Sequence, residues 1–294
     1  MISGRTLGSA ILLLVLGNAL AVLSDALIKW QGADMPIFQF IFIRMALTLC
    51  LLLPFISQVD RSRLFAGWKL HLVRSHMGFF GIYCMVIALT TLPLATANAL
   101  FYAAPILVMV FSVIIFGEKL RGISLFAVIS GLAGILVILR PVELTWGALS
   151  ALGVALSLAL TVVLIRKLPT HQSMVHTLIL TMVFGLPTAL VLALWEGAAW
   201  DPQILMTAFG SAFFILAYNM TVLLAYRHVP ASEVTSAEYT GLLSAMLFGW
   251  LWFQEIPDAW FIVGSMMIVG PLVMISLLER RRTRVPIRTA GVTP

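Results

Sequence analysis

The sequence predicts an all-α membrane protein of ten transmembrane helices, arranged as two five-helix repeats of opposite orientation. Three observations support this fold class: an apolar composition, ten apolar stretches of membrane-spanning length, and a segment that recurs in the second half of the chain. Of the 294 residues, 61% are hydrophobic and 10% are charged. Soluble domains average about 45–50% apolar and about 25% charged residues. Lipid is therefore expected to be the main solvent of this chain.

Ten stretches are apolar and long enough to cross a bilayer, which takes about 20 residues per helix. They are residues 7–28, 36–57, 70–91, 94–116, 122–140, 145–165, 173–195, 203–226, 230–253 and 259–278. The connectors are short, so consecutive helices are expected to be antiparallel and directly packed. Met1 to Arg5 lead into the first stretch without a small-residue cleavage site, so we predict no cleavable signal peptide.

The basic residues predict the orientation of the bundle, because cytoplasmic connectors of membrane proteins are rich in Lys and Arg. With both termini in the cytoplasm, every Lys and Arg lies on that side except Lys29, Arg140 and Arg44. The opposite side then collects the acidic residues Asp34, Glu143, Glu196, Asp201, Glu255 and Asp258. The net charge of +6 is spread over connectors and tail, which argues against a nucleic-acid partner. The polar, basic tail from 279 to 294 is expected to be disordered and to contact anionic lipid.

An internal repeat relates residues 92–118 to residues 229–255 at a constant offset of 137. The matching positions are Pro93/Pro230, Tyr102/Tyr239, Met109/Met246, Phe111/Phe248, Phe116/Phe253 and Glu118/Glu255. Five helices per repeat is an odd number, so the second copy must be inverted in the membrane. Inverted copies can exchange conformations and open a shared site to either side in turn. A passive channel has no need of such an exchange.

These features resemble the drug/metabolite transporter superfamily, whose members contain EamA-type repeats. The resemblance rests on the ten spans, the two repeats, the proline-led helix that ends on Gly117 and Glu118, and Arg44 near the start of the second span. The segment from His76 to Phe80 is most similar to the YddG group of bacterial amino-acid exporters. The second repeat departs from the first, with Gln254 in place of Gly117 and Leu242 in place of Pro105.

The resemblance implies a first repeat at 1–140, a second, inverted repeat at 141–278 and a cytoplasmic tail at 279–294. It also implies a multi-pass protein of the bacterial inner membrane that exports small solutes by alternating access. We expect such a protein to work as a monomer or weak dimer with membrane lipid and a small-molecule substrate as its partners, and without a cofactor.

A substrate cavity in such a bundle needs aromatic walls and a few convergent polar groups. The candidates are Asn18, His76, Phe79, Phe80, Tyr83, Asn98, Tyr102, Ser157, Tyr218, Asn219, Ser236, Glu238 and Tyr239. Spacings of three and four place the four candidates from His76 to Tyr83 on one helical face, and Asn98 with Tyr102 on another. Each residue could instead hold helices together, since Asn, Ser and Tyr often bond between membrane helices.

Ionisable groups inside hydrocarbon are costly and often functional. Glu238 is interpreted as a proton carrier or as the partner of a substrate amine, and Arg44 as a structural or gating residue. Asp25 and Glu233 lie nearer the helix ends and are expected to be cap or interface groups, with Asp25 facing water. Pro105 lacks a backbone donor and can kink its helix as a hinge.

Amino acids with aromatic or other neutral side chains, and related amphipathic compounds, are the predicted cargo, because the cavity candidates are neutral and aromatic. Antiport of nucleotide-sugars or organophosphates is the alternative, but phosphate recognition calls for Lys or Arg clamps. An intramembrane enzyme is disfavoured, since the spans contain no Gly-x-Ser-x-Gly nucleophile turn, His-Glu-x-x-His motif or paired aspartates. Cys50 and Cys84 lie inside apolar spans, which argues against a disulfide or a metal site.

Overall fold

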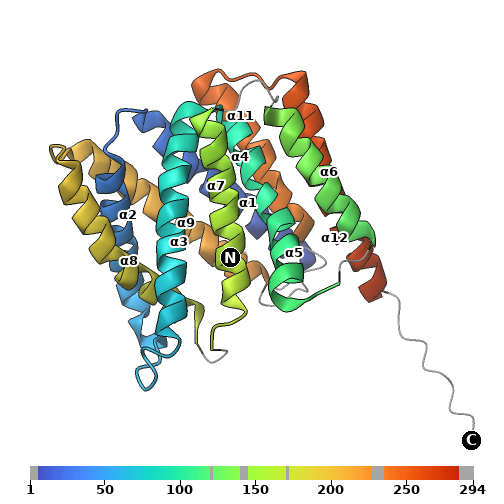
Figure 1. The fold of residues 1–294 in the computed structure, drawn as a ribbon. Coiled ribbons are helices and arrows are strands. Elements are labelled where there is room, and N and C mark those ends of the chain that lie inside the picture. The colour runs from blue at the N-terminus through green and yellow to red at the C-terminus, as the bar shows by residue number, and fades with distance from the viewer. Residues whose placement is uncertain (1–5, 120–121, 140–144, 170–171, 227–234, 285–294) are drawn as a thin grey trace, which may run out of the picture.

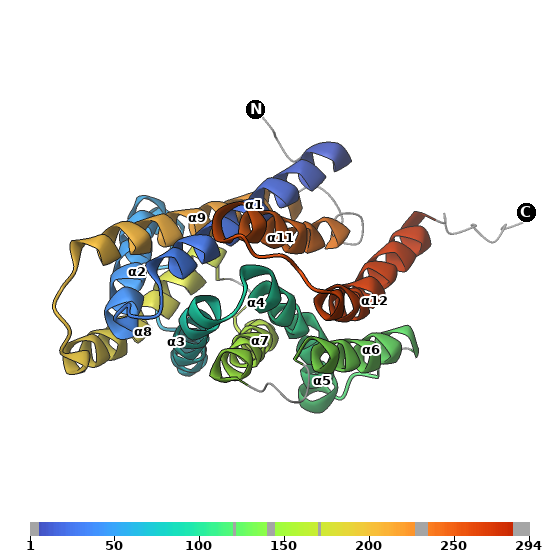
Figure 2. The ribbon, with the colours of Figure 1, turned by 90° about the horizontal axis from the view of Figure 1, so that it is seen from above.

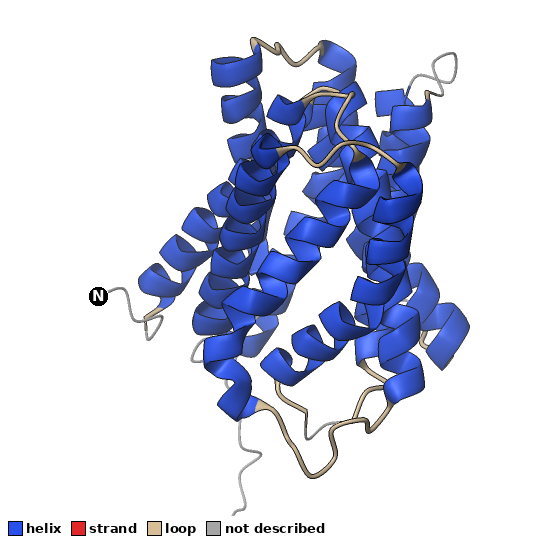
Figure 3. Ribbon diagram, turned by 90° about the vertical axis from the view of Figure 1, so that its left-hand side faces the viewer, coloured by secondary structure: helices blue, strands red, loops and turns tan. Residues whose placement is uncertain are grey.

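The computed structural model describes residues 6–119, 122–139, 145–169, 172–226 and 235–284, and these contain helices and no strands (Figure 3). The described helices are α1 (Leu7–Gln31), α2 (Ile37–Leu52), η1 (Leu53–Gln58), α3 (Trp68–Thr91), α4 (Leu94–Phe101), α5 (Ala103–Phe116), α6 (Gly122–Leu139), α7 (Trp146–Ile165), α8 (Met174–Glu196), α9 (Pro202–Tyr226), η2 (Thr235–Tyr239), α11 (Thr240–Phe253) and α12 (Ala259–Arg284). Arg140, Glu143, Arg227, Glu233 and the tail beyond 284 lie outside the described residues, as does the side chain of Ser236.

Eight of the described helical segments are long and apolar enough to cross a membrane. They are Leu7–Gln31, Ile37–Gln58, Trp68–Thr91, Leu94–Phe116, Gly122–Leu139, Trp146–Ile165, Met174–Glu196 and Pro202–Ala225. Ala259–Ile275 is a shorter apolar helix. The predicted all-helical membrane fold is confirmed for the described residues. The tenth predicted span corresponds to α12, and the ninth corresponds in part to η2 and α11.

The helices form one bundle in which consecutive membrane-length segments run in opposite directions (Figure 1). We call the face where α1 begins at Leu7 the amino-terminal face, and the face where α1 ends at Gln31 the opposite face. Seen from above, α1 lies between α9 and α11, α3 packs beside α7, and α12 packs beside α6 (Figure 2). The long apolar core is shared by most of these helices.

Short polar side chains begin several of these helices by accepting the otherwise unpaired amide hydrogens of the first turn. Thr6 caps α1 together with Ser9, Thr145 caps α7, and Ser173 caps α8. At the start of α2 the cap comes from a distant residue, because the carboxylate of Glu196 accepts hydrogen bonds from the backbone amides of Phe38 and Gln39 at 3.2 and 3.0 Å. This contact holds the start of α2 against the end of α8.

Two helix breaks occur at positions that correspond in the predicted repeat. Tyr102 separates α4 from α5 with φ −67° and ψ −3°, and Tyr239 separates η2 from α11 with φ −72° and ψ −6°. The break therefore lies three residues before Pro105, which occupies the first turn of α5, where its missing amide hydrogen costs little. Since Leu242 takes the place of Pro105 in the second half, the break does not depend on a proline.

Candidate functional site

A cavity of about 260 Å³, which we call the central cavity, lies inside the bundle between α2, α3, α7, α8 and α9. Its walls are mostly aliphatic and thioether side chains, including Met45, Ile82, Met85, Leu178 and Leu216. Its polar lining residues are Arg44, Thr48, Ser157, Thr161 and Asn219. The cavity runs from the middle of α2 towards the end of α7 and the start of α8, both of which lie at the amino-terminal face.

Arg44 is the one charged residue among the described side chains that line this cavity. The residue is 7% exposed, and its Nε has no hydrogen-bond partner among the described residues. A charge that is removed from water without complete pairing is costly. The guanidinium is therefore suited to receive an anionic group from the cavity.

Asp25 is buried beside this site, and the prediction that it faces water is wrong. Its exposure is 7%, its carboxyl is hydrogen-bonded with the side chain of Asn98, and it interacts electrostatically with Arg44. The helix continues to Gln31, well past the predicted end at residue 28, so Asp25 lies more than a turn inside it. Asp25, Asn98 and Arg44 thus form one buried polar group contributed by α1, α4 and α2.

A second group gathers five of the predicted site residues around the helix break at Tyr239. The Tyr102 hydroxyl donates a hydrogen bond to the backbone oxygen of Glu238 at 2.9 Å, and the amide of Asn18 donates to the backbone oxygen of Ala237 at 3.2 Å. Tyr102, Tyr218 and Tyr239 all interact electrostatically with the Glu238 carboxyl. Tyr102 also interacts with Asp25. This second group, which we call the tyrosine cluster, therefore adjoins the buried polar group of Asp25, Asn98 and Arg44.

The four aromatic candidates of α3 have different surroundings. Phe79 and Tyr83 stack on Phe38 of α2, and their ring centroids lie 6.2 and 5.4 Å, respectively, from the centroid of the Phe38 ring. Both ring nitrogens of His76 are engaged, with the Leu72 oxygen at 2.9 Å and the Thr188 hydroxyl at 3.0 Å. Phe80 is 42% exposed on the outside of the bundle. The stacked pair thus joins α2 to α3, while Phe80 lies apart from both polar groups.

Sequence reasoning missed Thr48, Thr161 and Phe38. Thr48 follows Arg44 by four residues and Thr161 follows Ser157 by four, so each lies on the same helical face as a predicted residue. That spacing could have identified both threonines. Phe38 had no such signal, because its role depends on how α2 lies against α3.

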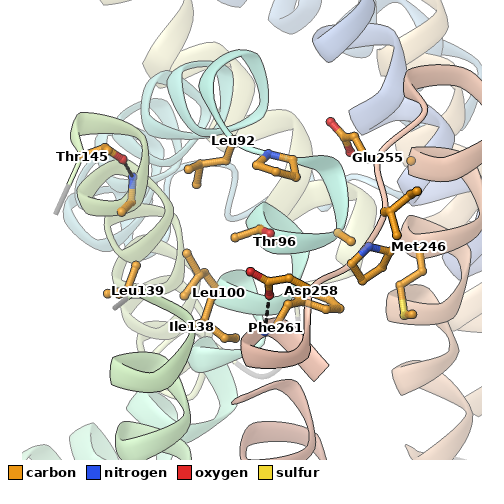
Figure 4. A pocket seen from close by; sticks show the side chains of 16 residues that line it. Leu92, Thr96, Leu100, Ile138, Leu139, Thr145, Met246, Glu255, Asp258 and Phe261 are labelled. Atoms are coloured by element: carbon orange, nitrogen blue, oxygen red, sulfur yellow. Dashed lines mark hydrogen bonds between the residues drawn. The ribbon is translucent and has the colours of Figure 1, made fainter. Parts of the chain in front are cut away.

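A second cavity, of about 360 Å³, lies at the opposite face between α4, α6, α7, α11 and α12. Figure 4 shows its lining, with Thr96, Glu255 and Asp258 among mainly apolar neighbours. The Asp258 carboxylate accepts a hydrogen bond from the Phe261 amide at 2.7 Å at the start of α12. Among the described residues, no three His, Cys, Asp or Glu side chains converge as a metal site.

Comparison with known proteins identifies the family. The EamA-like transporter family matches residues 8–140 and, a second time, residues 145–277. The chain belongs to the EamA-like transporter family. The predicted resemblance to the drug/metabolite transporter superfamily is thereby confirmed. This EamA-like transporter is also similar to a solved structure titled "Crystal structure of protein", with a TM-score of 0.56 and 21% identity, covering 95% of this chain and 98% of the other, a likeness that concerns the fold.

Curated relatives of this EamA-like transporter carry different cargo. The chain is 27% identical to the pseudopaline exporter CntI of Pseudomonas aeruginosa, covering 93% of this chain and 98% of the relative. It is 24% identical to the S-adenosylmethionine uptake transporter of Rickettsia prowazekii, covering 88% and 89%. It is 25% identical to the riboflavin transporter of Vibrio cholerae, covering 82% and 83%. The protein is therefore a multi-pass membrane transporter, and its named relatives, all transporters, are consistent with the prediction that it is not an enzyme.

Proposed function

We propose that this EamA-like transporter exports small amphipathic solutes that carry both a carboxylate and an amino group, including amino acids with neutral or aromatic side chains. The observation that carries the proposal is the buried, incompletely hydrogen-bonded guanidinium of Arg44 in the wall of an otherwise apolar cavity. A carboxylate is its natural ligand, because guanidinium–carboxylate hydrogen bonds are charge-assisted and can form in pairs.

The surroundings of Arg44 supply contacts for the other two parts of such a ligand, which are its amino group and its apolar part. The acidic side chains of Asp25 and Glu238 lie in the adjoining polar groups and can attract an ammonium group. The apolar part of the solute then packs against Ile82, Met85 and Leu216 of the cavity wall. A site with one apolar wall and charges of both signs favours zwitterions over simple cations or simple acids.

The proposed topology has ten transmembrane helices in two inverted repeats, 1–140 and 141–278, in the bacterial inner membrane with both termini in the cytoplasm. In support, Arg61, Lys69 and Arg166 lie at the amino-terminal face, while Glu196 and Glu255 lie at the opposite face. In this orientation the cavity extends towards the cytoplasm, as loading of an exporter requires.

The alternative of nucleotide-sugar or organophosphate antiport fits the cavity less well. A phosphate group is usually held by several Lys or Arg side chains. Arg44 is the single basic residue among the described lining residues, and an acidic residue lies beside it. That balance of charge suits one carboxylate rather than a phosphate chain.

Counterflow in proteoliposomes tests the proposal. Purified protein would be reconstituted with an unlabelled solute inside, and entry of labelled amino acids, organic cations or nucleotide-sugars would be measured with and without a pH gradient. We expect exchange of neutral and aromatic amino acids above protein-free liposomes. Exchange of nucleotide-sugars or of organic cations without any amino acid would contradict the proposal.

A further inference from the structure

At the opposite face, an ion pair joins Lys29 at the end of α1 to Glu255 just after α11. The Lys29 Nζ lies 3.0 Å from the Glu255 Oε1 and 5.4 Å from the centroid of the Phe253 ring. We call Lys29, Phe253 and Glu255 the Lys29 clamp. Both charged side chains are largely buried, with exposures of 13% and 19%.

The Lys29 clamp also binds the ends of two further helices. The Lys29 ammonium donates hydrogen bonds to the backbone oxygens of Leu92 at 2.6 Å and Leu89 at 3.3 Å, at the end of α3. The Glu255 Oε2 accepts one from the Leu94 amide at 2.7 Å, at the start of α4. A cation at a helix end and an anion at a helix start both complement the helix dipole. The Lys29 clamp therefore holds four helices together at this face, namely α1, α3, α4 and α11.

A second clamp, which also combines a basic residue, a phenylalanine and a glutamate, lies at the amino-terminal face. The Arg166 Nη2 donates to the Glu118 Oε1 at 2.6 Å, and the Arg166 guanidinium lies 4.3 Å from the centroid of the Phe116 ring. We call Arg166, Phe116 and Glu118 the Arg166 clamp. Its cation follows α7 and its acid follows α5.

The two clamps correspond residue by residue at the repeat offset of 137. Lys29 corresponds to Arg166, Phe253 to Phe116 and Glu255 to Glu118. In each clamp the cation comes from one EamA-like segment and the Phe and Glu from the other, as a two-fold relation between the segments requires. The backbone agrees, because Gly117 and Gln254 both end their helices in the left-handed conformation, with φ of 66° and 54°.

The two clamps differ in burial. The Arg166 and Glu118 side chains are 51% and 45% exposed, whereas those of Lys29 and Glu255 are largely enclosed. An exposed ion pair contributes little to stability, because water screens it. In this conformation the opposite face is therefore fastened by the stronger of two equivalent contacts, and the central cavity extends towards the other face.

We propose that the two clamps are the alternating gates of the transport cycle. The Lys29 clamp closes the opposite face in the conformation seen here, and the Arg166 clamp becomes buried and closes the amino-terminal face when the Lys29 clamp opens. This inference rests on alternating access as proposed above, but not on the identity of the cargo. It assigns Lys29, Glu255, Arg166 and Glu118 as residues that set the balance between the two states.

Thiol labelling from the two sides of the membrane tests this proposal without any cargo. Thr48→Cys, in a chain that also carries Cys50→Ser and Cys84→Ala, places a single thiol in the central cavity. Its reaction rate with a membrane-impermeant reagent would be compared in vesicles of both orientations. With intact clamps we expect faster reaction from the cytoplasmic side.

Glu255→Gln and Glu118→Gln are a matched pair of gate variants. We expect Glu255→Gln to shift the ratio of the two labelling rates towards the outer side by about tenfold, the effect of losing one hydrogen-bonded charge. Glu118→Gln should shift the ratio in the other direction, and Asp201→Asn, at a surface carboxylate outside both clamps, should leave it near the starting value. A shift in the same direction for both Gln variants, or no shift in either, would overturn the proposal.

Disulfide trapping gives a second test, in which a covalent bond takes the place of each ion pair. Oxidised Lys29→Cys/Glu255→Cys should hold the cavity thiol accessible from the cytoplasmic side alone. Oxidised Arg166→Cys/Glu118→Cys should hold it accessible from the outer side alone. Labelling from both sides in either oxidised protein would contradict the assignment of the gates. If the gates behave as expected but no amino acid is exchanged, the cargo proposal fails while this inference stands.

Discussion

Tyr102 and Tyr239 contact each other across the bundle, with ring centroids 5.7 Å apart, and each lies at the break of its own helix. The two residues correspond at the offset of 137, so the contact joins equivalent positions of the two EamA-like segments. Ser130 and Met267 form a second such contact, with the Ser130 hydroxyl donating to the Met267 oxygen at 2.8 Å. Contacts between equivalent positions lie on a two-fold axis. Both contacts support the proposed inverted repeat.

Arg44→Gln is expected to reduce counterflow of carboxylate-bearing solutes by at least about tenfold, because a charge-assisted hydrogen bond contributes roughly 1.5–3 kcal/mol. Exchange of a matched amine that lacks the carboxylate should change much less. The comparison of the two solutes in proteoliposomes checks this. An equal loss for both would place Arg44 in the fold rather than in recognition.

Removal of Arg44 also leaves Asp25 buried without its opposite charge, which is destabilising. Arg44→Gln should therefore lower protein yield, and Arg44→Gln/Asp25→Asn should recover much of it. Yield and thermal unfolding of the two variants in detergent measure this coupling. No recovery in the double variant would show that the two side chains are energetically independent.

Glu238→Gln is expected to remove the pH dependence of transport, because its carboxyl is the acidic side chain at the centre of the tyrosine cluster. Initial rates across a series of internal and external pH values measure this effect. Asp201→Asn is the control, since that carboxylate serves a local contact with the Gln203 amide on the surface. An unchanged pH profile in Glu238→Gln would exclude this residue as a proton carrier.

Tyr83→Ala and Tyr102→Ala should change the order of preferred substrates more than they change yield. Tyr83 belongs to the stack on Phe38 beside the cavity helices, and Tyr102 bonds to the Glu238 backbone. Competition by a panel of unlabelled amino acids in the counterflow assay reports that order. Phe209→Ala removes an exposed aromatic ring and serves as the control. Variants that lose yield alone would assign both tyrosines to structure.

Gly134→Ala is expected to destabilise the bundle by roughly 1–3 kcal/mol, as overpacking does. An added Cβ would lie 2.6 Å from the Gly264 backbone oxygen and 2.9 Å from the Met267 Cβ, where α6 meets α12. Gly270→Ala on α12 meets nothing within 4 Å and should be neutral or slightly stabilising. Thermal unfolding in detergent compares the two. Equal midpoints would show that α6 and α12 can separate at no cost.

The sequence was sufficient to predict the helical elements because apolar length is a local property. Every predicted span overlaps a described helix, and the helix end at Gly117 follows from the freedom of glycine at positive φ. The corresponding helix end at Gln254 adopts the same conformation without glycine. Its residue type therefore gave no signal, and this end could be predicted only from its correspondence to Gly117 in the repeat.

The site was less predictable, because it depends on which faces of distant helices meet. The distance of Arg44 and Glu238 from the ends of their predicted spans was enough to identify them as ionisable groups that are costly to place in hydrocarbon. It was not enough to show that Arg44 lines a cavity. Asp25 was misplaced because its burial depends on the length of α1 and on its neighbours in α2 and α4. His76 and Phe80 share a predicted face with Tyr83, yet one bonds to α8 and the other is exposed.

Protection of a cavity thiol by cargo tests the central claim most directly. Thr48→Cys lies in the central cavity and Thr96→Cys in the cavity at the opposite face, so the two single-thiol proteins form a matched pair. Their labelling rates would be measured with and without a saturating amino acid that the wild-type protein exchanges. We predict that the amino acid slows labelling of Thr48→Cys and leaves that of Thr96→Cys unchanged. Protection at Thr96→Cys alone, or at neither position, would contradict the assignment of the central cavity as the transport site.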